Sequence, residues 1–318
     1  MTTTPAAEPA HRPVPAGASG VIAFIGLGNM GGPMAANLVR AGYRVQAFDL
    51  AEPALAAARD AGVTVATDAG EAARGADVVI TMLPAGRHVL STYSGGLLDA
   101  APAGALFIDC STIDVADARK AVEAAHAAGK RALDAPVSGG TTGATNGTLT
   151  FMVGGADADV DAARPVLEAM GRKIVHCGGS GAGQAAKLCN NMLLGIQMIG
   201  VAEAFVLAES LGLSQEALFE VSSTATGQCW ALNTNCPVPG PVPTSPANRD
   251  YQGGFAVALM AKDLGLATTA LDAGGLGSPL GRLAAQVYGD LATTDRAGQD
   301  FSTVINVLRE RTATATQS

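Results

Sequence analysis

A glycine-rich turn directly after a short apolar segment constrains the fold more than any other feature of this sequence. The apolar segment Val21–Ile25 is typical of a buried strand, and Gly26-Leu27-Gly28-Asn29-Met30-Gly31 follows it at once. A helical pattern comes next, from about residue 32 to residue 41. Glycines at this spacing allow a tight turn and let a pyrophosphate approach the backbone at the start of the helix. An ordinary strand-to-helix turn is the alternative.

The end of the next predicted strand supports a dinucleotide-binding turn. Residues 44–49 form this strand, and Asp49 lies 23 residues after Gly26. An acidic side chain at this place can accept hydrogen bonds from the adenosine ribose, and it repels the 2′-phosphate of NADP. Leu50 and Ala51 follow Asp49, so no arginine stands directly beside it. The sequence therefore predicts NAD as the cofactor.

Short apolar segments alternate with helical patterns through the first half of the chain. The further predicted strands lie at residues 63–66, 78–83, 105–110, 132–135 and 150–153. Strands separated by helices are typical of βαβ units with a mostly parallel sheet. A long apolar helix is predicted for residues 184–211, and later segments are helical apart from a proline-rich loop at 237–246. We expect an α/β fold, with a doubly wound Rossmann-type domain at residues 21–183. The long helix and an all-helical domain follow at residues 184–318.

Composition argues against several classes of function. The 318 residues contain 20 Lys and Arg against 28 Asp and Glu. This net charge of −8 is the opposite of what a nucleic-acid-binding surface needs. Five cysteines without a Cys-x-x-Cys pair and four scattered histidines predict neither a disulfide scaffold nor a metal site.

The N-terminal segment and the long helix indicate where in the cell the protein is located. Residues 1–20 lack the pattern of a targeting signal, and we expect them to be a disordered tail. Gln197, Glu203 and Glu209 interrupt the apolar segment 192–211, so no membrane span is expected. The predicted location is the cytoplasm.

Two further strand ends are candidates for cofactor contacts, because ligands of open α/β sheets bind outside the carboxyl ends of the strands. Leu83 and Pro84 follow one predicted strand, and Ser111 and Thr112 follow the next. A proline that ends a strand, and a helix N-cap at Ser111 or Thr112, explain the same residues without a ligand. The sequence alone leaves these explanations open.

The segment Ser138-Gly139-Gly140 is a candidate anion site. A Ser-Gly-Gly turn can direct successive backbone N–H groups at a carboxylate. A flexible loop is the competing explanation, because Gly and Thr also dominate the residues that follow. The chain has no Gly-x-Ser-x-Gly motif, so nothing indicates a serine hydrolase.

Lys187 and Asn191 lie near the start of the long predicted helix and share one of its faces, because they are four residues apart. A lysine in an otherwise apolar helix is unfavourable to bury unless it has a function. A partly desolvated lysine can reach a pKa of about 7–8, which suits proton transfer. The alternative is a lysine whose stem lies on apolar surface while its amine reaches water. Residues 176–183, which precede the helix, are interpreted as a hinge.

Together these segments resemble the β-hydroxyacid dehydrogenase family over about residues 21–308. The resemblance rests, in chain order, on Gly26-Leu-Gly-Asn-Met-Gly31, Met82-Leu-Pro84, Asp134-Ala-Pro-Val-Ser-Gly-Gly140, Gly183-Gln-Ala-Ala-Lys-Leu-Cys-Asn-Asn191 and Met260-Ala-Lys-Asp-Leu264. Residues 237–240, 251–255 and 300–302 look like the branch of this family that acts on 3-hydroxyisobutyrate.

The resemblance implies a role for each residue that matches. Lys187 corresponds to the lysine that takes the hydroxyl proton as NAD takes the hydride, and Asn191 to a residue that holds the substrate. Ser138, Gly139 and Gly140 correspond to the loop that binds the substrate carboxylate. The implied cofactor contacts are Gly26, Leu27, Gly28, Asn29, Met30, Gly31, Asp49, Leu83, Pro84, His88, Thr112 and Lys262, and Thr112 also borders the substrate. His88 stands where the family often has Asn.

The reaction implied by the resemblance is NAD-dependent oxidation of 3-hydroxyisobutyrate to 2-methyl-3-oxopropanoate in valine breakdown. The implied partner is this small molecule, and the implied assembly is a homodimer or homotetramer. Two alternatives stay open: another short hydroxyacid substrate, such as 3-hydroxypropanoate or one related to tartronate semialdehyde, and a non-catalytic dinucleotide-binding interaction protein. Lys187 with Asn191 favours an enzyme, and Lys187 argues against the related imine reductases, which replace it.

Overall fold

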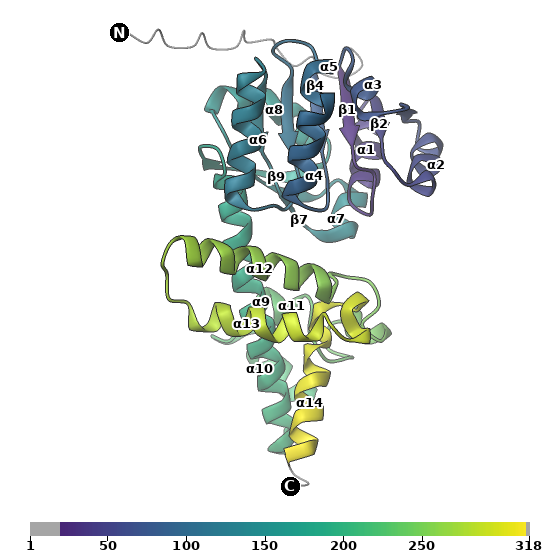
Figure 1. Cartoon of the computed structure of the whole chain (residues 1–318). Coiled ribbons are helices and arrows are strands. Elements are labelled where there is room, and N and C mark those ends of the chain that lie inside the picture. Colours follow the sequence, from purple (N-terminus) through teal and green to yellow (C-terminus); the bar gives the residue numbers. More distant parts are fainter. Residues whose placement is uncertain (1–19, 316–318) are drawn as a thin grey trace. The chain divides into compact units, whose positions relative to one another are not determined.

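The computed structural model describes residues 20–315, with side chains described up to residue 312 (Figure 1). The chain divides into two compact units, the first ending at Lys187 and the second beginning at Leu188. The predicted domain boundary lies between residues 183 and 184. The expected disordered tail at residues 1–20 lies outside the described residues, apart from Gly20.

The first unit is built on a mostly parallel sheet. Within residues 20–315, nine strands form this sheet in the order β3-β2-β1-β4-β5-β6-β8-β7, with β9 paired to β8. Neighbours from β3 to β6 are parallel, as are β8 and β9, whereas β6 and β7 are antiparallel to β8. The strands are β1 (Val21–Ile25), β2 (Arg44–Phe48), β3 (Thr64–Val65), β4 (Val78–Thr81), β5 (Leu106–Asp109), β6 (Arg131–Asp134), β7 (Val137–Ser138), β8 (Leu149–Gly154) and β9 (Gly171–Gly178). The predicted α/β class is confirmed.

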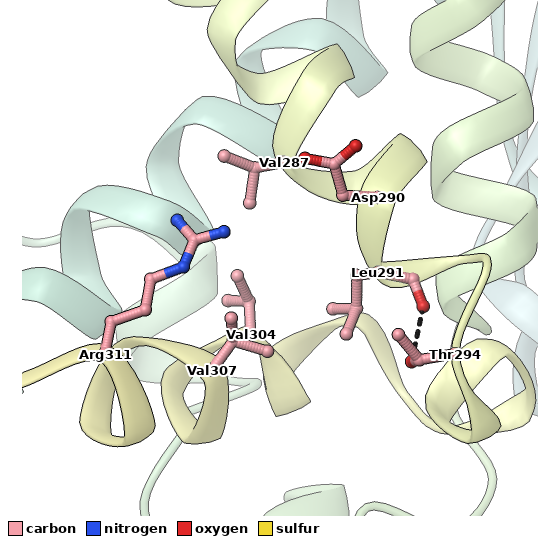
Figure 2. A pocket seen from close by; sticks show the side chains of 7 residues that line it. All are labelled: Val287, Asp290, Leu291, Thr294, Val304, Val307 and Arg311. Atoms are coloured by element: carbon pink, nitrogen blue, oxygen red, sulfur yellow. Dashed lines mark hydrogen bonds between the residues drawn. The ribbon is translucent and has the colours of Figure 1, made fainter. Parts of the chain in front are cut away.

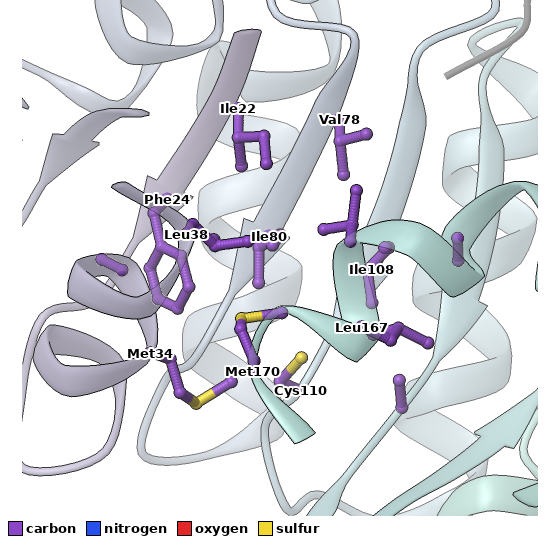
Figure 3. Packing of buried hydrophobic residues seen from close by; sticks show 14 of the residues in the cluster. Ile22, Phe24, Met34, Leu38, Val78, Ile80, Ile108, Cys110, Leu167 and Met170 are labelled. Carbon is purple, nitrogen blue, oxygen red and sulfur yellow. The ribbon is translucent and has the colours of Figure 1, made fainter. Parts of the chain in front are cut away.

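Helices cover both faces of the sheet, which is why the central strands read as continuous apolar runs. Phe24 of β1 belongs to a buried cluster that also contains side chains of α1 and α8, and Figure 3 shows it beside its strand partner Ile80 of β4. Ala23 and Ile25 point to the other face and pack with α3, α4 and α6. The helical segments are α1 (Gly31–Arg40), α2 (Glu52–Asp60), α3 (Ala69–Ala73), α4 (Gly86–Thr92), the π-helical η2 (Tyr93–Leu97), α5 (Leu98–Ala100), α6 (Val115–Ala127), α7 (Gly140–Asn146) and α8 (Asp157–Glu168).

Sequence patterns predicted the strands of the first unit unevenly. The seven predicted strands coincide with β1 to β6 and β8, and their ends differ by at most two residues. The pattern missed β7, which has only two residues, and β9, whose side chains are mostly exposed and include Arg172 and Lys173. Such a strand lacks the apolar run on which the prediction depends. Residues 176–183, interpreted as a hinge, contain the end of β9, a turn and the first residues of α9 (Ala182–Ser210).

The second unit is helical, as predicted. Most of α9 belongs to this unit, and no strand follows β9 in the described part of the chain, where a single bridge pairs Ala256 with Asp300. Phe205 of α9, Met260 of α12 and Tyr288 of α13 are fully buried in its core. The other helices are α10 (Gln215–Ser222), α11 (Trp230–Asn233), α12 (Val257–Ala273), α13 (Pro279–Leu291) and α14 (Val304–Ala315), and the 3₁₀ segments are η3 (Pro246–Arg249), η4 (Asp295–Gly298) and η5 (Phe301–Thr303).

The apolar helix α9 is only partly buried within the chain. Among the described helices, α9 alone is long and apolar enough to cross a membrane by length and composition, with a mean hydropathy of 1.6. The core helix of a soluble protein passes the same test. Met198, Ala202 and Phe205 of α9 are buried in the core of the second unit, and 39% of the apolar window is buried in all, so packing within the chain accounts for part of the apolar sequence.

Candidate active site

The strand order of the sheet places a binding crevice beside β1. The chain passes from β1 to β2 and β3 on one side, and then returns to β4 on the other side of β1. Loops that leave the carboxyl ends of two such strands diverge, and open α/β sheets bind ligands at this point. The two loops are Gly26–Gly31 after β1 and Leu83–Pro84 after β4, so topology brings together two segments that the sequence predicted as cofactor contacts.

The glycine turn has the shape that a dinucleotide requires. Gly26 has φ +96°, and a Cβ there would overlap the carbonyl oxygen of Met82. A Cβ at Gly31 would overlap the carbonyl oxygen of Gly26, so the turn closes only with glycine. Gly28, in contrast, has no atom within 4 Å of a Cβ position, and its backbone faces open space. Since α1 begins at Gly31, its first N–H groups can meet an anion here. These residues fit a bound pyrophosphate.

Asp49 holds the glycine turn in place. Its Oδ2 accepts a hydrogen bond from the Leu27 amide at 2.6 Å, and its Oδ1 accepts one from the Ala51 amide at 2.8 Å. The side chain is half-buried. The carboxylate therefore lies against the turn at the end of β2, where this type of fold binds the adenosine ribose. The bond to Leu27 is a structural role that the sequence did not reveal.

A buried carboxylate ties the ends of β4 and β5 together. Asp109 Oδ1 accepts hydrogen bonds from the Thr81 hydroxyl at 2.7 Å and the Ser111 hydroxyl at 2.6 Å. The Ser111 hydroxyl in turn accepts a bond from the Leu83 amide at 2.8 Å. Asp109 is only 3% exposed, and this burial raises its pKa to about 6, although the hydrogen bonds oppose the rise. The network fixes the two loops expected to border the cofactor.

The structure excludes one of the explanations of Ser111 and Thr112. Helix α6 begins at Val115, and its N-cap is Asp114, which accepts a hydrogen bond from the Ala116 amide at 2.7 Å. The N-cap explanation of Ser111 or Thr112 is therefore wrong. Ser111 is fully buried in the Asp109 network, and Thr112 is half-buried directly after it.

The Ser-Gly-Gly segment has a backbone conformation that requires its glycines. Ser138 ends β7 and is half-buried, whereas Gly139 and Gly140 are exposed at the start of α7. Gly139 has φ +134° and Gly140 has φ +61°. Both values are unfavourable for residues with a side chain, so the chain can take this course only with glycine at these positions. Carboxylate binding here stays a prediction.

Lys187 and Asn191 are both buried on α9, at 7% and 2% exposure. Most of the Lys187 side chain is therefore removed from water. The Asn191 amide donates a hydrogen bond to Asp263 Oδ2 on α12, at 2.6 Å, and Asp263 is 4% exposed. Asp263 fixes the orientation of a predicted substrate-binding amide.

Two further predicted cofactor contacts lie on separate elements. His88 is half-buried on α4, and its buried Nδ1 has no hydrogen-bond partner among the described residues. Lys262 is half-buried on α12 of the second unit. Their contacts with the cofactor stay predictions. Within the described part, no group of three or more His, Cys, Asp or Glu side chains could hold a metal ion.

Two cavities of the second unit lie away from these residues. One, of about 130 Å³, lies between α13 and α14, and Figure 2 shows Val287, Leu291, Val304 and Val307 around it, with Arg311 and Asp290 among its polar lining. The other, of about 350 Å³, is lined by residues of α9, α10 and α11. Because neither is lined by a predicted site residue, neither is assigned to the active site.

The Rossmann-type unit with its glycine turn, the buried lysine on α9 and the helical unit that follows define a class: dinucleotide-dependent oxidoreductases. Family comparison agrees. Residues 21–179 match the NAD binding domain of 6-phosphogluconate dehydrogenase, and residues 181–308 match the NAD-binding domain of NADP-dependent 3-hydroxyisobutyrate dehydrogenase. The chain belongs to the 3-hydroxyisobutyrate dehydrogenase family.

Curated relatives and a solved structure cover nearly the whole chain. The probable 3-hydroxyisobutyrate dehydrogenase of Mycobacterium tuberculosis is 58% identical over 91% of this chain and 98% of its own length. The NAD-dependent L-serine dehydrogenase of Pseudomonas aeruginosa is 50% identical over 89% and 96%. The structure of the Mycobacterium tuberculosis enzyme, titled with L-serine, is similar with a TM-score of 0.89 at 57% identity over 91% and 99%.

These findings establish the enzyme class. The protein is an NAD-dependent hydroxyacid dehydrogenase that acts on a small molecule, with NAD as its cofactor. The alternative of a non-catalytic interaction protein is set aside. The curated relatives of this chain are named as enzymes, and the chain matches them over almost their full length.

Proposed function

We propose that the protein oxidises 3-hydroxyisobutyrate to 2-methyl-3-oxopropanoate (methylmalonate semialdehyde) with NAD, in valine breakdown and in the cytoplasm. The burial of Lys187 at 7% exposure carries the proposal, because a lysine is unfavourable in an apolar helix unless its amine has a function. Two relatives named for this substrate, at 58% and 52% identity, support the choice of hydroxyacid.

Each residue of the predicted site has its own role in the proposed reaction. Backbone N–H groups of Ser138, Gly139 and Gly140 bind the substrate carboxylate, and the Asn191 amide, held by Asp263, orients the substrate. The Lys187 amine accepts the proton of the substrate hydroxyl as the C–O bond becomes a carbonyl. Bound NAD supplies the acceptor for the hydride that leaves the same carbon. In the reverse direction Lys187 returns its proton to the oxygen.

We propose that Asp49 makes NAD the preferred cofactor over NADP. Its carboxylate is held at the end of β2 by the Leu27 and Ala51 amides. An NAD ribose offers hydroxyl donors to this carboxylate, whereas the NADP 2′-phosphate brings a second negative charge close to it. The family model of the second domain describes an NADP-dependent enzyme, so the two cofactors must be compared directly.

L-Serine is a second candidate substrate. A relative at 50% identity is named NAD-dependent L-serine dehydrogenase, and the similar solved structure is titled with L-serine. Both substrates are 3-hydroxypropanoates with the same carboxylate and the same primary hydroxyl. They differ only at carbon 2, which carries a methyl group in 3-hydroxyisobutyrate and an ammonium group in L-serine. The same carboxylate loop and base can therefore serve either molecule.

We also propose that the protein assembles as a homodimer or homotetramer. The second unit exposes large apolar side chains, including Leu211 at 75%, Val221 at 65% and Leu280 at 61%. Exposed apolar side chains form an association surface where they lie side by side. Size-exclusion chromatography with light scattering measures the mass, and a value near the 31.6 kDa of one chain would contradict this proposal.

The test of the function is NADH formation at 340 nm. The panel contains 3-hydroxyisobutyrate, L-serine, 3-hydroxypropanoate and glycerate, each with NAD and with NADP. We expect the highest kcat/KM for 3-hydroxyisobutyrate with NAD. A higher value for L-serine would keep the mechanism and replace the substrate. Turnover with none of the four would refute the proposed function.

A further inference from the structure

The start of α9 is fixed to the sheet by a carboxylate from another element. Asp134, at the end of β6, is 1% exposed. Its Oδ1 accepts a hydrogen bond from the Gly181 amide at 2.6 Å, and its Oδ2 accepts one from the Gln184 amide at 2.9 Å. The first N–H groups of a helix lack partners within the helix. Asp134 therefore caps α9 from the sheet and joins it to the end of β6.

The side chain of Gln184 makes a second attachment, on a different strand end. It is fully buried, its Nε2 donates to the Ser111 carbonyl at 2.7 Å, and its Oε1 accepts from the Ile113 amide at 3.1 Å. Both ends of one amide group are thus bonded to the backbone on either side of Thr112. The Ser111 side chain belongs to the Asp109 network, so the attachment continues into the loop after β4.

Close packing leaves the start of α9 little freedom to shift. A Cβ at Gly183 would lie 2.8 Å from Asp134 Oδ2 and would overlap the Met152 carbonyl oxygen. A Cβ at Gly154 would lie 2.8 Å from the Gly183 amide nitrogen. Glycine at these two positions lets β8 and α9 approach each other closely enough for the Asp134 bonds to form.

We propose that Gln184, together with Asp134, is a positioning residue for Lys187. Gln184 stands one helical turn before Lys187, and its amide sets the distance between this part of α9 and the backbone around Thr112. The inference rests on the proposed function, in which Lys187 takes the substrate proton. Neither positioning residue touches the reacting atoms. Their effect is on geometry, and a displacement of about 1 Å at a reacting group can lower a rate about 100-fold.

The first variant is Gln184→Met, which keeps the length of the side chain and removes both hydrogen bonds. We expect kcat to fall roughly 10- to 100-fold. The dissociation constant of NADH should rise less than kcat falls, because Thr112 lies between the two lost bonds whereas the glycine turn and Asp49 are unaffected. The control is Lys130→Met. Lys130 is 6% exposed at the amino end of β6 and donates to the Ala101 and Pro102 carbonyls. This variant also loses buried hydrogen bonds, but at the amino ends of the strands, away from the start of α9.

A second variant separates positioning from stability by its pH dependence. In Gln184→Glu, the carboxyl group has the same shape as the amide. It can donate a hydrogen bond to the Ser111 carbonyl only when it is protonated. Burial favours this protonated form. The ratio of kcat in the variant to kcat in the wild type should therefore rise several-fold from pH 8 to pH 6. A merely structural role predicts the same ratio at every pH at which both proteins are folded.

Amide hydrogen exchange tests the attachment without any turnover. In Gln184→Met, peptides that contain residues 111–114 and 181–187 should exchange faster, and in Lys130→Met they should not. If the wild type oxidises none of the hydroxyacids, the proposed function fails, and exchange alone decides whether Gln184 holds α9. Unchanged exchange in these peptides, or a Gln184→Met kcat equal to that of Lys130→Met, would overturn the proposal.

Discussion

Asp109 makes the stability of the first unit depend on pH in a way that can be measured. Burial raises the pKa of this carboxyl from 3.8 to about 6. The folded state therefore binds the proton more tightly than the unfolded chain, and ionised Asp109 destabilises the fold. At about 1.4 kcal/mol for each pH unit, the rise corresponds to about 3 kcal/mol. This penalty is absent below about pH 4, grows between pH 4 and pH 6, and is complete above pH 6.

The perturbation is Asp109→Asn, which has no charge at any pH. Asparagine can still accept the bonds from the Thr81 and Ser111 hydroxyls. The free energy of unfolding of the variant minus that of the wild type should therefore rise by about 3 kcal/mol from pH 4 to pH 7. Thr81→Val is the complementary change. It removes a donor that lowers the Asp109 pKa, so this variant should lose more stability than the wild type over the same range.

The assay needs a probe for each unit, because two units need not unfold together. Cys110, next to Asp109, is fully buried in the first unit, and Cys236 is fully buried in the second. The protein is equilibrated in urea at each pH and then exposed to a brief pulse of a thiol reagent at one fixed pH. Mass spectrometry of the two peptides gives an unfolding midpoint for each unit.

We expect the change in stability to be confined to the first unit and to depend on pH. Asp109→Asn should shift the Cys110 midpoint increasingly from pH 4 to pH 7 and leave the Cys236 midpoint unchanged. A difference that stays constant between pH 4 and pH 7 would refute the argument that burial controls this carboxyl. An equal shift at Cys236 would mean that the variant acts on the whole chain.

Three further variants test the cofactor turn, the base and the core. Lys187→Ala should lower kcat roughly 10²- to 10⁴-fold with an unchanged circular dichroism spectrum, and turnover near the wild-type value would end its assignment as the base. Asp49→Ala should raise the KM for NAD more than the KM for NADP, and an unchanged ratio would place cofactor selectivity elsewhere. Phe24→Ala, at a fully buried position of β1, should lower the free energy of unfolding by about 3–5 kcal/mol, and urea denaturation showing less than about 1 kcal/mol would contradict its packing.

The dinucleotide turn and most of the sheet were predictable because their signals are local. Gly26–Gly31 directly follows β1, and Asp49 directly follows β2, so short segments contain the whole pattern. A strand buried on both faces is a run of apolar residues that can be recognised without its neighbours. The strand β9 was missed for the opposite reason, since its side chains are mostly exposed and it is held by pairing with β8.

The hydrogen-bond partners of Gln184 and Asn191 on α9 depend on tertiary structure. Lys187 and Asn191 could be placed on one helix from their spacing alone. Their partners could not, because Asp263 meets Asn191 across 72 residues and Gln184 meets Ser111 across 73. A buried amide or carboxylate needs a hydrogen-bond partner, and the fold supplies that partner from a distant part of the chain. The sequence does not show which two residues will form such a bond. Local pattern therefore determined which residues form strands, turns and helices, whereas the network around α9 depends on which of those elements the fold packs together.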